Sequence, residues 1–354
     1  MSKQRWPRAI LHLDMDAFYV NVHILDHPED AGVPLAIGGK PDQRGVVASA
    51  SYAARAKGVR SAMPMSTAVR LCPTLKIAPA NWPRIQECSQ QIMAILAKYG
   101  PVEKMSVDEA YVDLSAQPDP VNMAAQIKTA VKNQTQLPCS VGLATSKLVA
   151  KVASDYDKPE GFTIVRPGEE VFFLAPLPTR ALYGIGPRTA EKLATLGIHT
   201  CAELAKADPL LLKRHFGKHG PSMTERAQGI DHRSVKPHRG PAKSISQEWT
   251  FSKDVNEPEV LLAQLEKMSV RVAQSLQKRG LVARTVWVKF RWADFTTFTR
   301  QKSLDVGIDR AEDIFRVARA IWQANWPPGQ PMRLLGVGVG YLEKPTGRQL
   351  GFNF

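Results

Sequence analysis

The chain has 354 residues, and its 47 Lys and Arg outnumber its 33 Asp and Glu to give a formal net charge of +14. This length suits two or three domains, and a hydrophobic content of 44% excludes an intrinsically disordered chain. Four scattered cysteines without a C-x-x-C pair give no sequence support to a zinc site or a disulfide framework, and they suit a reduced, cytoplasmic protein. The longest apolar run, residues 334–342, is too short to span a bilayer, so we expect no membrane partner.

The excess positive charge predicts an acidic partner, and the alternatives are nucleic acid, an anionic membrane surface or solubility alone. More than half of this excess lies after residue 235. Between Lys267 and Lys302, nine Lys or Arg residues accompany a single acid, Asp294, and aromatic residues lie among them.

The segment 10–20, ILHLDMDAFYV, alternates apolar and polar residues. A period of two predicts a half-buried strand. In such a strand Asp14 and Asp16 point to the same face.

Two further elements are expected in the N-terminal half. Segment 81–100 has apolar residues near helical spacing, and Gly100 is the expected end of this helix. Segment 102–115 has strand-like stretches on both sides of residues 106–109. This pattern predicts a hairpin with acidic residues at its bend.

The C-terminal half contains a compact helical unit, a basic tether and a further domain. Residues 181–198 combine Gly-Ile-Gly with a proline at the first position of a short helix. A basic segment rich in Pro and Gly then follows Asp231, as is typical of a tether. Beyond it the predicted order is strand, helix, strand, strand, helix and strand, at 244–251, 257–279, 284–292, 296–304, 309–325 and 332–342. This βαββαβ order predicts a split-βαβ domain.

One strand of that domain predicts two different faces. Val286, Val288, Phe290 and Trp292 share one side, and Trp287, Lys289 and Arg291 share the other. The first set is expected to face the core, and the second to form a basic platform.

Three acidic residues lie where strands usually hold apolar groups: Asp14, Asp108 and Glu109. Carboxylates brought together repel one another unless divalent cations lie between them. Two such ions about 3.5 to 4 Å apart can stabilise an in-line displacement at phosphorus. The alternative is that each acid ends a strand or caps a turn.

Five features of the chain form a specific combination: LDMDAFY at 13–19, ASASYAARAKGVRSAMP at 48–64, MSVDEAYVDLS at 105–115, SVGLATSKLVAKVASDYDKPEG at 140–161, and the Gly-Ile-Gly turn. In this combination the chain resembles the Y-family DNA polymerases, specifically the DinB or DNA polymerase IV branch. The resemblance covers essentially the whole chain.

The resemblance implies an α+β multidomain fold, the right-hand polymerase, with palm, fingers, a helical thumb and a βαββαβ little finger. The thumb is expected to hold a helix-hairpin-helix motif. The implied divisions are palm at 1–17 and 81–166, fingers at 18–80, thumb at 167–232, basic linker at 233–243, little finger at 244–342 and a flexible tail at 343–354.

The resemblance also implies a metal site. Asp14, Asp108 and Glu109 match the family's catalytic, metal-binding carboxylates, and the main-chain carbonyl of Met15 matches a further ligand. The cofactor implied is Mg²⁺, with two ions per active site. Asp16 does not match a ligand, and we expect it to be structural.

A dNTP site follows from the same resemblance. The residues matching triphosphate contacts are the backbone amide of Phe18 and the side chains of Ser49, Tyr52, Arg55 and Lys158. Tyr19 matches the steric gate, an aromatic ring that collides with a 2′-hydroxyl. Gly39 and Ala48 match the roof over the new base pair, and the ring of Phe18 is expected to lie in the core.

DNA and protein partners are implied at other positions. The residues expected to contact primer-template DNA are Gly184, Gly186, Lys243, Lys289 and Arg291, without reading sequence. The C-terminal residues matching a peptide that binds the bacterial sliding clamp, the β clamp, are Gln349, Leu350, Phe352 and Phe354. The alternative for this tail is packing against its own domain.

The leading hypothesis is a cytoplasmic, monomeric DNA-directed DNA polymerase of the translesion type. It adds dNTPs to a primer 3′ end by two-metal nucleotidyl transfer, with low fidelity and low intrinsic processivity, and bypasses damaged template bases. One alternative is a non-catalytic DNA-damage accessory protein that keeps the polymerase fold. Another is an enzyme that uses a similar palm to cyclise nucleotides.

Overall fold

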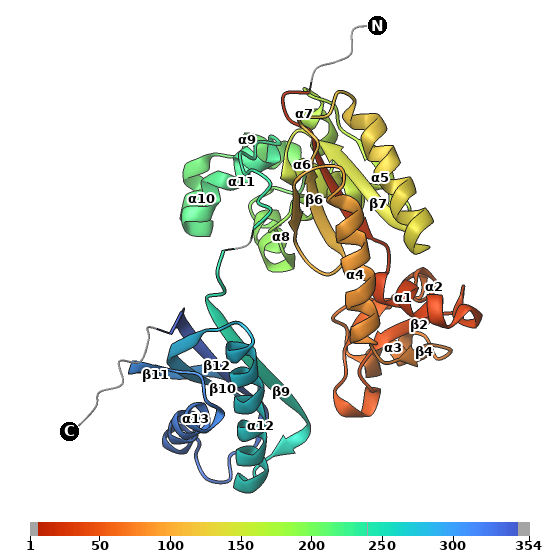
Figure 1. The fold of residues 1–354 in the computed structure, drawn as a ribbon. Helices are drawn as coiled ribbons and strands as arrows, with labels where there is room; N and C mark the ends of the chain where they lie inside the picture. The colour runs from red at the N-terminus through yellow and green to blue at the C-terminus, as the bar shows by residue number, and fades with distance from the viewer. Residues whose placement is uncertain (1–5, 239, 346–354) are drawn as a thin grey trace, which may run out of the picture. The chain divides into compact units, whose positions relative to one another are not determined.

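The computed structural model of the protein describes residues 6–238 and 240–345 (Figure 1). The chain divides into two compact units. The first comprises residues 1–38, 47–63 and 67–239, and the second comprises residues 39–46, 64–66 and 240–354.

A five-stranded sheet forms the centre of the first unit, in the order β5-β6-β1-β7-β8. Its strands are β1 (Ile10–Met15), β5 (Val102–Lys104), β6 (Glu109–Asp113), β7 (Cys139–Ala144) and β8 (Phe162–Ile164). Helices α4 (Trp82–Leu96) and α5 (Pro120–Thr135) share a core with Leu11 and Leu13 on one face. Helix α6 (Lys147–Tyr156) shares a second core with Ile10 on the other face.

The prediction of a half-buried strand at 10–20 is wrong. Strand β1 ends at Met15, and all six of its residues are buried because helices cover both faces of the sheet. Helix α1 (Phe18–Asp26) begins almost directly after it. Polar residues of β1 therefore face a covered layer and need partners there.

The predicted helix at 81–100 exists but is shorter. Helix α4 ends at Leu96, and the backbone then closes with turns in which Tyr99 donates to the carbonyl of Leu96 at 3.0 Å. Glycine at position 100 instead allows close backbone packing, because a Cβ there would lie 2.3 Å from the carbonyl oxygen of Asp113. The hairpin at 102–115 is confirmed, since β5 and β6 pair antiparallel around a bend that contains Asp108.

A smaller sheet lies beside α1, with the order β3-β2-β4. Its strands are β2 (Leu35–Gly38), β3 (Val47–Ala50) and β4 (Lys76–Ala78). Two helices lie between β3 and β4 in the chain: α2 (Tyr52–Ala56) and α3 (Met65–Leu71). Val20 of α1 packs against Leu35 and Ile37 of this sheet.

Five short helices continue the core beneath α6. They are α7 (Glu170–Leu174), α8 (Pro187–Ala194), α9 (Cys201–Lys206), α10 (Pro209–Phe216) and α11 (Gly220–Ala227). Pro187 occupies the first position of α8, as predicted, and Gly184 in the preceding turn has a φ of +92° that favours glycine.

The predicted tether begins as a bound segment of the first unit. Arg8 donates to the carbonyl oxygens of Asp231 and Arg233 at 3.0 and 2.7 Å, and Glu103 accepts from the backbone N–H of Lys236 at 2.7 Å. Val235 is buried in the core of α6. These contacts anchor residues 231–236.

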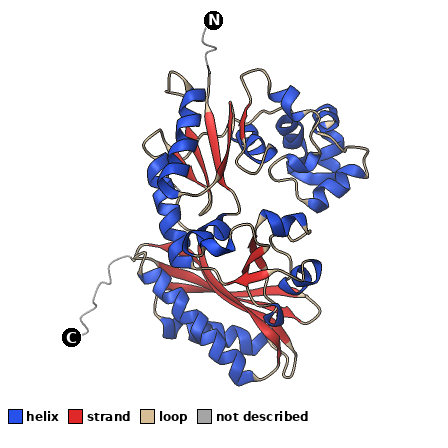
Figure 2. Cartoon of the chain, turned by 90° about the vertical axis from the view of Figure 1, so that its right-hand side faces the viewer, coloured by secondary structure: helices blue, strands red, loops and turns tan. Residues whose placement is uncertain are grey.

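The second unit contains the predicted βαββαβ order. It runs β9 (Ser244–Val255), α12 (Pro258–Gln277), β10 (Val282–Trp292), β11 (Thr297–Ile308), α13 (Ala311–Asn325) and β12 (Met332–Glu343). Its sheet has the order β11-β10-β12-β9, and both helices lie on one face of it (Figure 2). No helix in the described part of the chain is long and apolar enough to cross a lipid bilayer.

Strand β10 has the two faces that its alternation predicts. Val286, Val288 and Phe290 are fully buried on the helix side. On the other face Lys289 pairs with Glu248 of β9 at 2.9 Å. A strand that is distant in sequence thus supplies an acid that the segment around β10 does not contain, and the basic platform is partly neutralised.

Helix α6 packs closely against β7 at Gly142. A Cβ there would lie 2.2 Å from the carbonyl oxygen of Ala150 and 2.4 Å from the nitrogen of Ser154. Gly142→Ala should therefore lower the free energy of unfolding of the first unit by about 1–3 kcal/mol, measured by thermal unfolding. The matched control is Gly240→Ala, where nothing lies within 4 Å of the added atom. Equal melting temperatures for both variants would contradict the packing argument.

Candidate active site

Main-chain geometry brings the predicted acidic residues to one end of the sheet. Asp14 lies directly opposite Glu109 in the antiparallel pairing of β1 with β6. The backbone N–H of Met15 donates to the carbonyl oxygen of Asp108 at 3.0 Å. Because directly opposed residues have Cβ atoms about 5 Å apart, their side chains are forced to interact.

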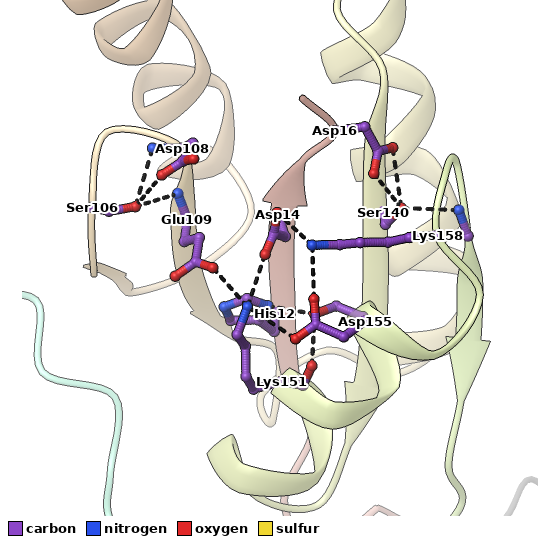
Figure 3. A network of polar contacts seen from close by, with 12 residues as sticks. His12, Asp14, Asp16, Ser106, Asp108, Glu109, Ser140, Lys151, Asp155 and Lys158 are labelled. Carbon is purple, nitrogen blue, oxygen red and sulfur yellow. Dashed lines mark hydrogen bonds and ion pairs between the residues drawn. The ribbon is translucent and has the colours of Figure 1, made fainter. Parts of the chain in front are cut away.

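Two lysines lie among these acids (Figure 3). The ammonium of Lys151 lies 2.8 Å from Asp14 and 2.6 Å from Glu109, so it bridges the two carboxylates. Lys158 contacts the other oxygen of Asp14 at 2.8 Å. Asp155 contacts both lysines, at 3.2 and 2.7 Å. The result is a compact network of alternating charges.

The carboxylate of Asp108 is held by Ser106 and not by these lysines. Its carboxylate accepts a hydrogen bond from Ser106, whose hydroxyl also accepts from the backbone N–H of Glu109 at 3.0 Å. Within residues 6–238 and 240–345, no three His, Cys, Asp or Glu side chains converge as a metal-binding group. The structure therefore brings Asp14 and Glu109 together and leaves the Asp108 carboxylate beside Ser106.

The pKa values of the two opposed carboxyl groups shift in opposite directions. Burial, followed by the hydrogen bond with Asp14, raises the pKa of Glu109 to about 7, although Lys151 opposes this shift. Burial also acts to raise the pKa of Asp14. The hydrogen bond with Glu109 and the charges of Lys151 and Lys158 outweigh it and hold that pKa well below its usual range.

His12 anchors the helix that carries Lys151. Its Nδ1 lies 2.8 Å from the hydroxyl of Ser154, and that hydroxyl donates to the carbonyl oxygen of Lys151 at 2.8 Å. Burial, and then the charge of Lys151, lower the pKa of His12 well below its ordinary value. The ring is therefore neutral and joins β1 to α6.

Asp16 does not share the environment of Asp14, so the expectation of one common face is wrong. It lies past the end of β1 and is 2% exposed. Its carboxylate accepts from the hydroxyl of Ser140 at 2.9 Å and from the backbone N–H of Glu160 at 2.8 Å. These contacts attach the loop that follows Lys158 to the sheet.

A single cavity of about 300 Å³ adjoins these groups. It contains most of the residues predicted for metal and nucleotide, together with Lys151 and Asp155. The residues lining it are Asp14, Met15, Asp16, Ala17, Phe18, Tyr19, Ala48, Ser49, Tyr52, Arg55, Ser61, Asp108, Glu109, Lys151, Asp155 and Lys158. Gly39 does not line it.

The Tyr52 and Arg55 pair has a defined geometry on α2. Ser51 caps this helix by accepting from the N–H of Ala54 at 3.2 Å. The guanidinium of Arg55 lies 4.7 Å from the centre of the Tyr52 ring, and the Tyr52 hydroxyl donates to Asp16 at 3.2 Å. Both side chains are thereby oriented beside the cavity.

The adjacent aromatic residues of α1 differ in exposure. Phe18 is 3% exposed and belongs to the core of the first unit. Tyr19 is half-buried and lines the cavity.

Sequence reasoning missed three residues of the site: Ser106, Lys151 and Asp155. All three lie inside motifs that carry the family resemblance. A detectable signal for the last two was their i, i+4 spacing on one face of a helix next to the predicted lysine Lys158.

The donor set suits a hard divalent cation. Asp14, Met15, Asp108 and Glu109 line the cavity, and Mg²⁺ prefers oxygen ligands such as carboxylates. Histidine and cysteine are absent from the residues lining this cavity, so its chemistry does not suit a structural zinc site.

The residues predicted to contact DNA are not brought together by either unit alone. Gly184 and Gly186 precede α8 in the first unit, whereas Lys243, Lys289 and Arg291 belong to the second. The predicted clamp-binding residues, from Gln349 to Phe354, lie outside the described residues.

Comparisons with known proteins agree on one family. The impB/mucB/samB family model matches residues 13–155, and the model of that family's C-terminal domain matches residues 242–352. A DNA polymerase IV of Bacillus cereus is 39% identical over 96% of this chain and 83% of the relative. A DNA polymerase IV of Methanoculleus marisnigri is 41% identical, with 97% of this chain and 96% of the relative covered.

Solved structures show the same fold. A Y-family DNA polymerase chimera superposes with a TM-score of 0.84 at 24% identity, covering 95% of this chain and 100% of the chimera. DinB from Sulfolobus solfataricus gives a TM-score of 0.64 at 25% identity, covering 94% and 98%. The expected right-hand polymerase fold is confirmed.

The network around Asp16 can be tested through Ser140, which is fully buried. Ser140→Ala removes a donor to Asp16 and leaves the backbone N–H of Gly161 without its acceptor at 3.1 Å. We expect the unfolding free energy in urea to fall by about 1–3 kcal/mol. The matched control, Ser222→Ala, removes one hydroxyl bonded locally to the carbonyl of His219. A loss no larger than the control's would contradict the buried network.

Proposed function

We propose a mechanism from the premise that this chain belongs to the Y family of DNA polymerases, in the DNA polymerase IV branch. It is a DNA-directed DNA polymerase of the translesion type, which uses primer-template DNA and dNTPs. The observation that best supports the mechanism is the cavity in which Asp14, Glu109, Lys151 and Lys158 meet Arg55.

Divalent metal dependence follows from membership of a DNA polymerase family. The proposed cofactor is a pair of Mg²⁺ ions held by Asp14, Asp108, Glu109 and the main-chain carbonyl of Met15. When bound, such a pair stabilises the attacking and leaving oxygens of an in-line displacement. Although burial acts to raise the pKa of Asp14, the hydrogen bond with Glu109 and the charges of Lys151 and Lys158 keep its carboxylate ionised, which is its cation-binding form.

The proposed triphosphate site lies in the same cavity. Arg55 and Lys158 supply positive charge, and the hydroxyls of Ser49 and Tyr52 supply donors. The backbone amide of Phe18 is a further donor. Phosphoryl transfer builds negative charge on the departing pyrophosphate, so fixed donors here favour the transition state.

Selection of the sugar and base pair is proposed to depend on small and aromatic residues. The ring of Tyr19 excludes a 2′-hydroxyl as a steric gate. Ala48, which lines the cavity, forms a sparse roof over the new base pair. A sparse roof admits bulky damaged bases, at the cost of low fidelity.

DNA binding is proposed to involve both units. Gly184 and Gly186 let backbone N–H groups approach a phosphate near the start of α8, while Lys243, Lys289 and Arg291 contact the duplex backbone. Such contacts are independent of sequence and sensitive to salt. The predicted domain boundaries, low intrinsic processivity, monomeric state and cytoplasmic location belong to the same proposal.

The C-terminal sequence supports a protein partner for the polymerase. Gln349, Leu350, Phe352 and Phe354 match a clamp-binding peptide, with apolar anchors that follow a Pro and Gly segment. The proposed partner is the sliding clamp.

The non-catalytic alternative is not favoured. A protein that only recruits partners has no need of Asp14, Asp108, Glu109, Arg55 and Lys158 together. Nucleotide cyclisation is also disfavoured, because the helix-hairpin-helix glycines and basic segment have no role in it.

The metal assignment predicts the behaviour of Asp108→Ala. Primer extension should fall at least about 100-fold, because one carboxylate ligand is lost at the reacting centre. DNA affinity, measured by fluorescence anisotropy, should remain. The matched control is Asp113→Ala at the other end of β6, where the carboxylate caps the backbone N–H of Ser115. Extension by Asp108→Ala at the rate of the control would overturn the assignment.

Deletion of residues 349–354 tests the clamp proposal. Stimulation of primer extension by the sliding clamp should be lost, and extension without the clamp should be unchanged, because the peptide acts only as an anchor. Retained stimulation, or an equal loss of both activities, is the result that contradicts it.

A further inference from the structure

Tyr19 has an aromatic neighbour from another element of the first unit. The centres of the Tyr19 and Trp82 rings are 5.5 Å apart, and their planes cross at 70°. This is an edge-to-face contact, the favoured geometry for aromatic pairs. Tyr19 is the second residue of α1 and Trp82 is the first residue of α4.

Local structure places Trp82 at that contact. The Asn81 side chain caps α4 by accepting from the N–H of Arg84 at 3.3 Å, and Pro83 occupies the second helical position. These two neighbours fix the backbone on both sides of Trp82. The indole is nevertheless 50% exposed, so burial in the core does not explain its position.

Tyr19 lines two cavities. One is the site cavity of about 300 Å³, and the other is a second cavity of about 210 Å³. The second cavity is lined by Tyr19, Val22, His23, Asp26, His27, Pro79, Asn81 and Ile85. A ring that borders a second cavity can move into that space, away from a ligand in the first cavity, unless another group holds it.

We propose that Trp82 is a positioning residue that holds the Tyr19 ring at the sugar-facing position. It thereby sets how strongly ribonucleotides are excluded. The inference rests on the proposed role of Tyr19 as the steric gate. A 2′-hydroxyl pushes the ring toward the second cavity, and the edge contact with Trp82 resists this movement. A deoxyribose does not push the ring, so its incorporation depends little on Trp82.

The test compares kcat/KM for one dNTP and the matching rNTP on the same primer-template. Trp82→Ala should lower the dNTP/rNTP discrimination ratio about 2- to 10-fold, mainly through a higher value for the rNTP. Trp82→Phe keeps an aromatic edge and should restore most of the ratio. The matched control is Trp249→Ala, which removes a similarly exposed indole, 45% exposed, from the second unit. An unchanged ratio for Trp82→Ala overturns the proposal.

A double-mutant cycle with Tyr19→Ala distinguishes the possible failures. Tyr19→Ala should lose discrimination, and adding Trp82→Ala should then have no further effect on the ratio. If Trp82→Ala lowers the ratio equally in the Tyr19→Ala background, Trp82 does not act through Tyr19 and the proposal fails. If Tyr19→Ala itself keeps full discrimination, the steric gate is wrong. Discrimination that is lost in Tyr19→Ala and unchanged in Trp82→Ala refutes only the role of Trp82.

Discussion

The antiparallel pairing of β1 with β6 places two carboxylates, Asp14 and Glu109, directly opposite each other, and their repulsion must be offset. The offset comes from the hydrogen bond between the two carboxyl groups and from the ammonium groups of Lys151 and Lys158. Lys151 reaches the site from α6, which packs against the sheet where Gly142 has no side chain. Lys158 reaches it from the loop that follows this helix.

The same arrangement gives the site rigid support. The acids are on strands or beside them, Lys151 is on a helix, and Asp16 attaches the loop after Lys158 through buried hydrogen bonds. Groups held on such elements need little rearrangement when charge develops during phosphoryl transfer. Tyr19 lines a second cavity as well as the site, and its ring contacts that of Trp82. Carboxylates on rigid elements suit the phosphoryl transfer of a DNA polymerase.

Sequence reasoning predicted the residues that belong to motifs and much of the order of elements. The period of β10 and the βαββαβ order are local properties, so they could be read directly. Burial of both faces of β1 could not be predicted from its own sequence, because α6, which covers one face, comes more than a hundred residues later. The role of Gly100 depends on Asp113, and the neutralisation of Lys289 depends on Glu248 in another strand. Lys151 was missed because its partners, Asp14 and Glu109, are distant in sequence.

The most direct test of translesion synthesis is primer extension by the unmodified protein with Mg²⁺ and all four dNTPs. One template is intact, and the other carries a damaged base one position beyond the primer. We expect extension on both templates, including insertion opposite the damaged base. Incorporation on neither template contradicts a polymerase built on Asp14, Asp108 and Glu109, and a stop before the damaged base contradicts the translesion assignment.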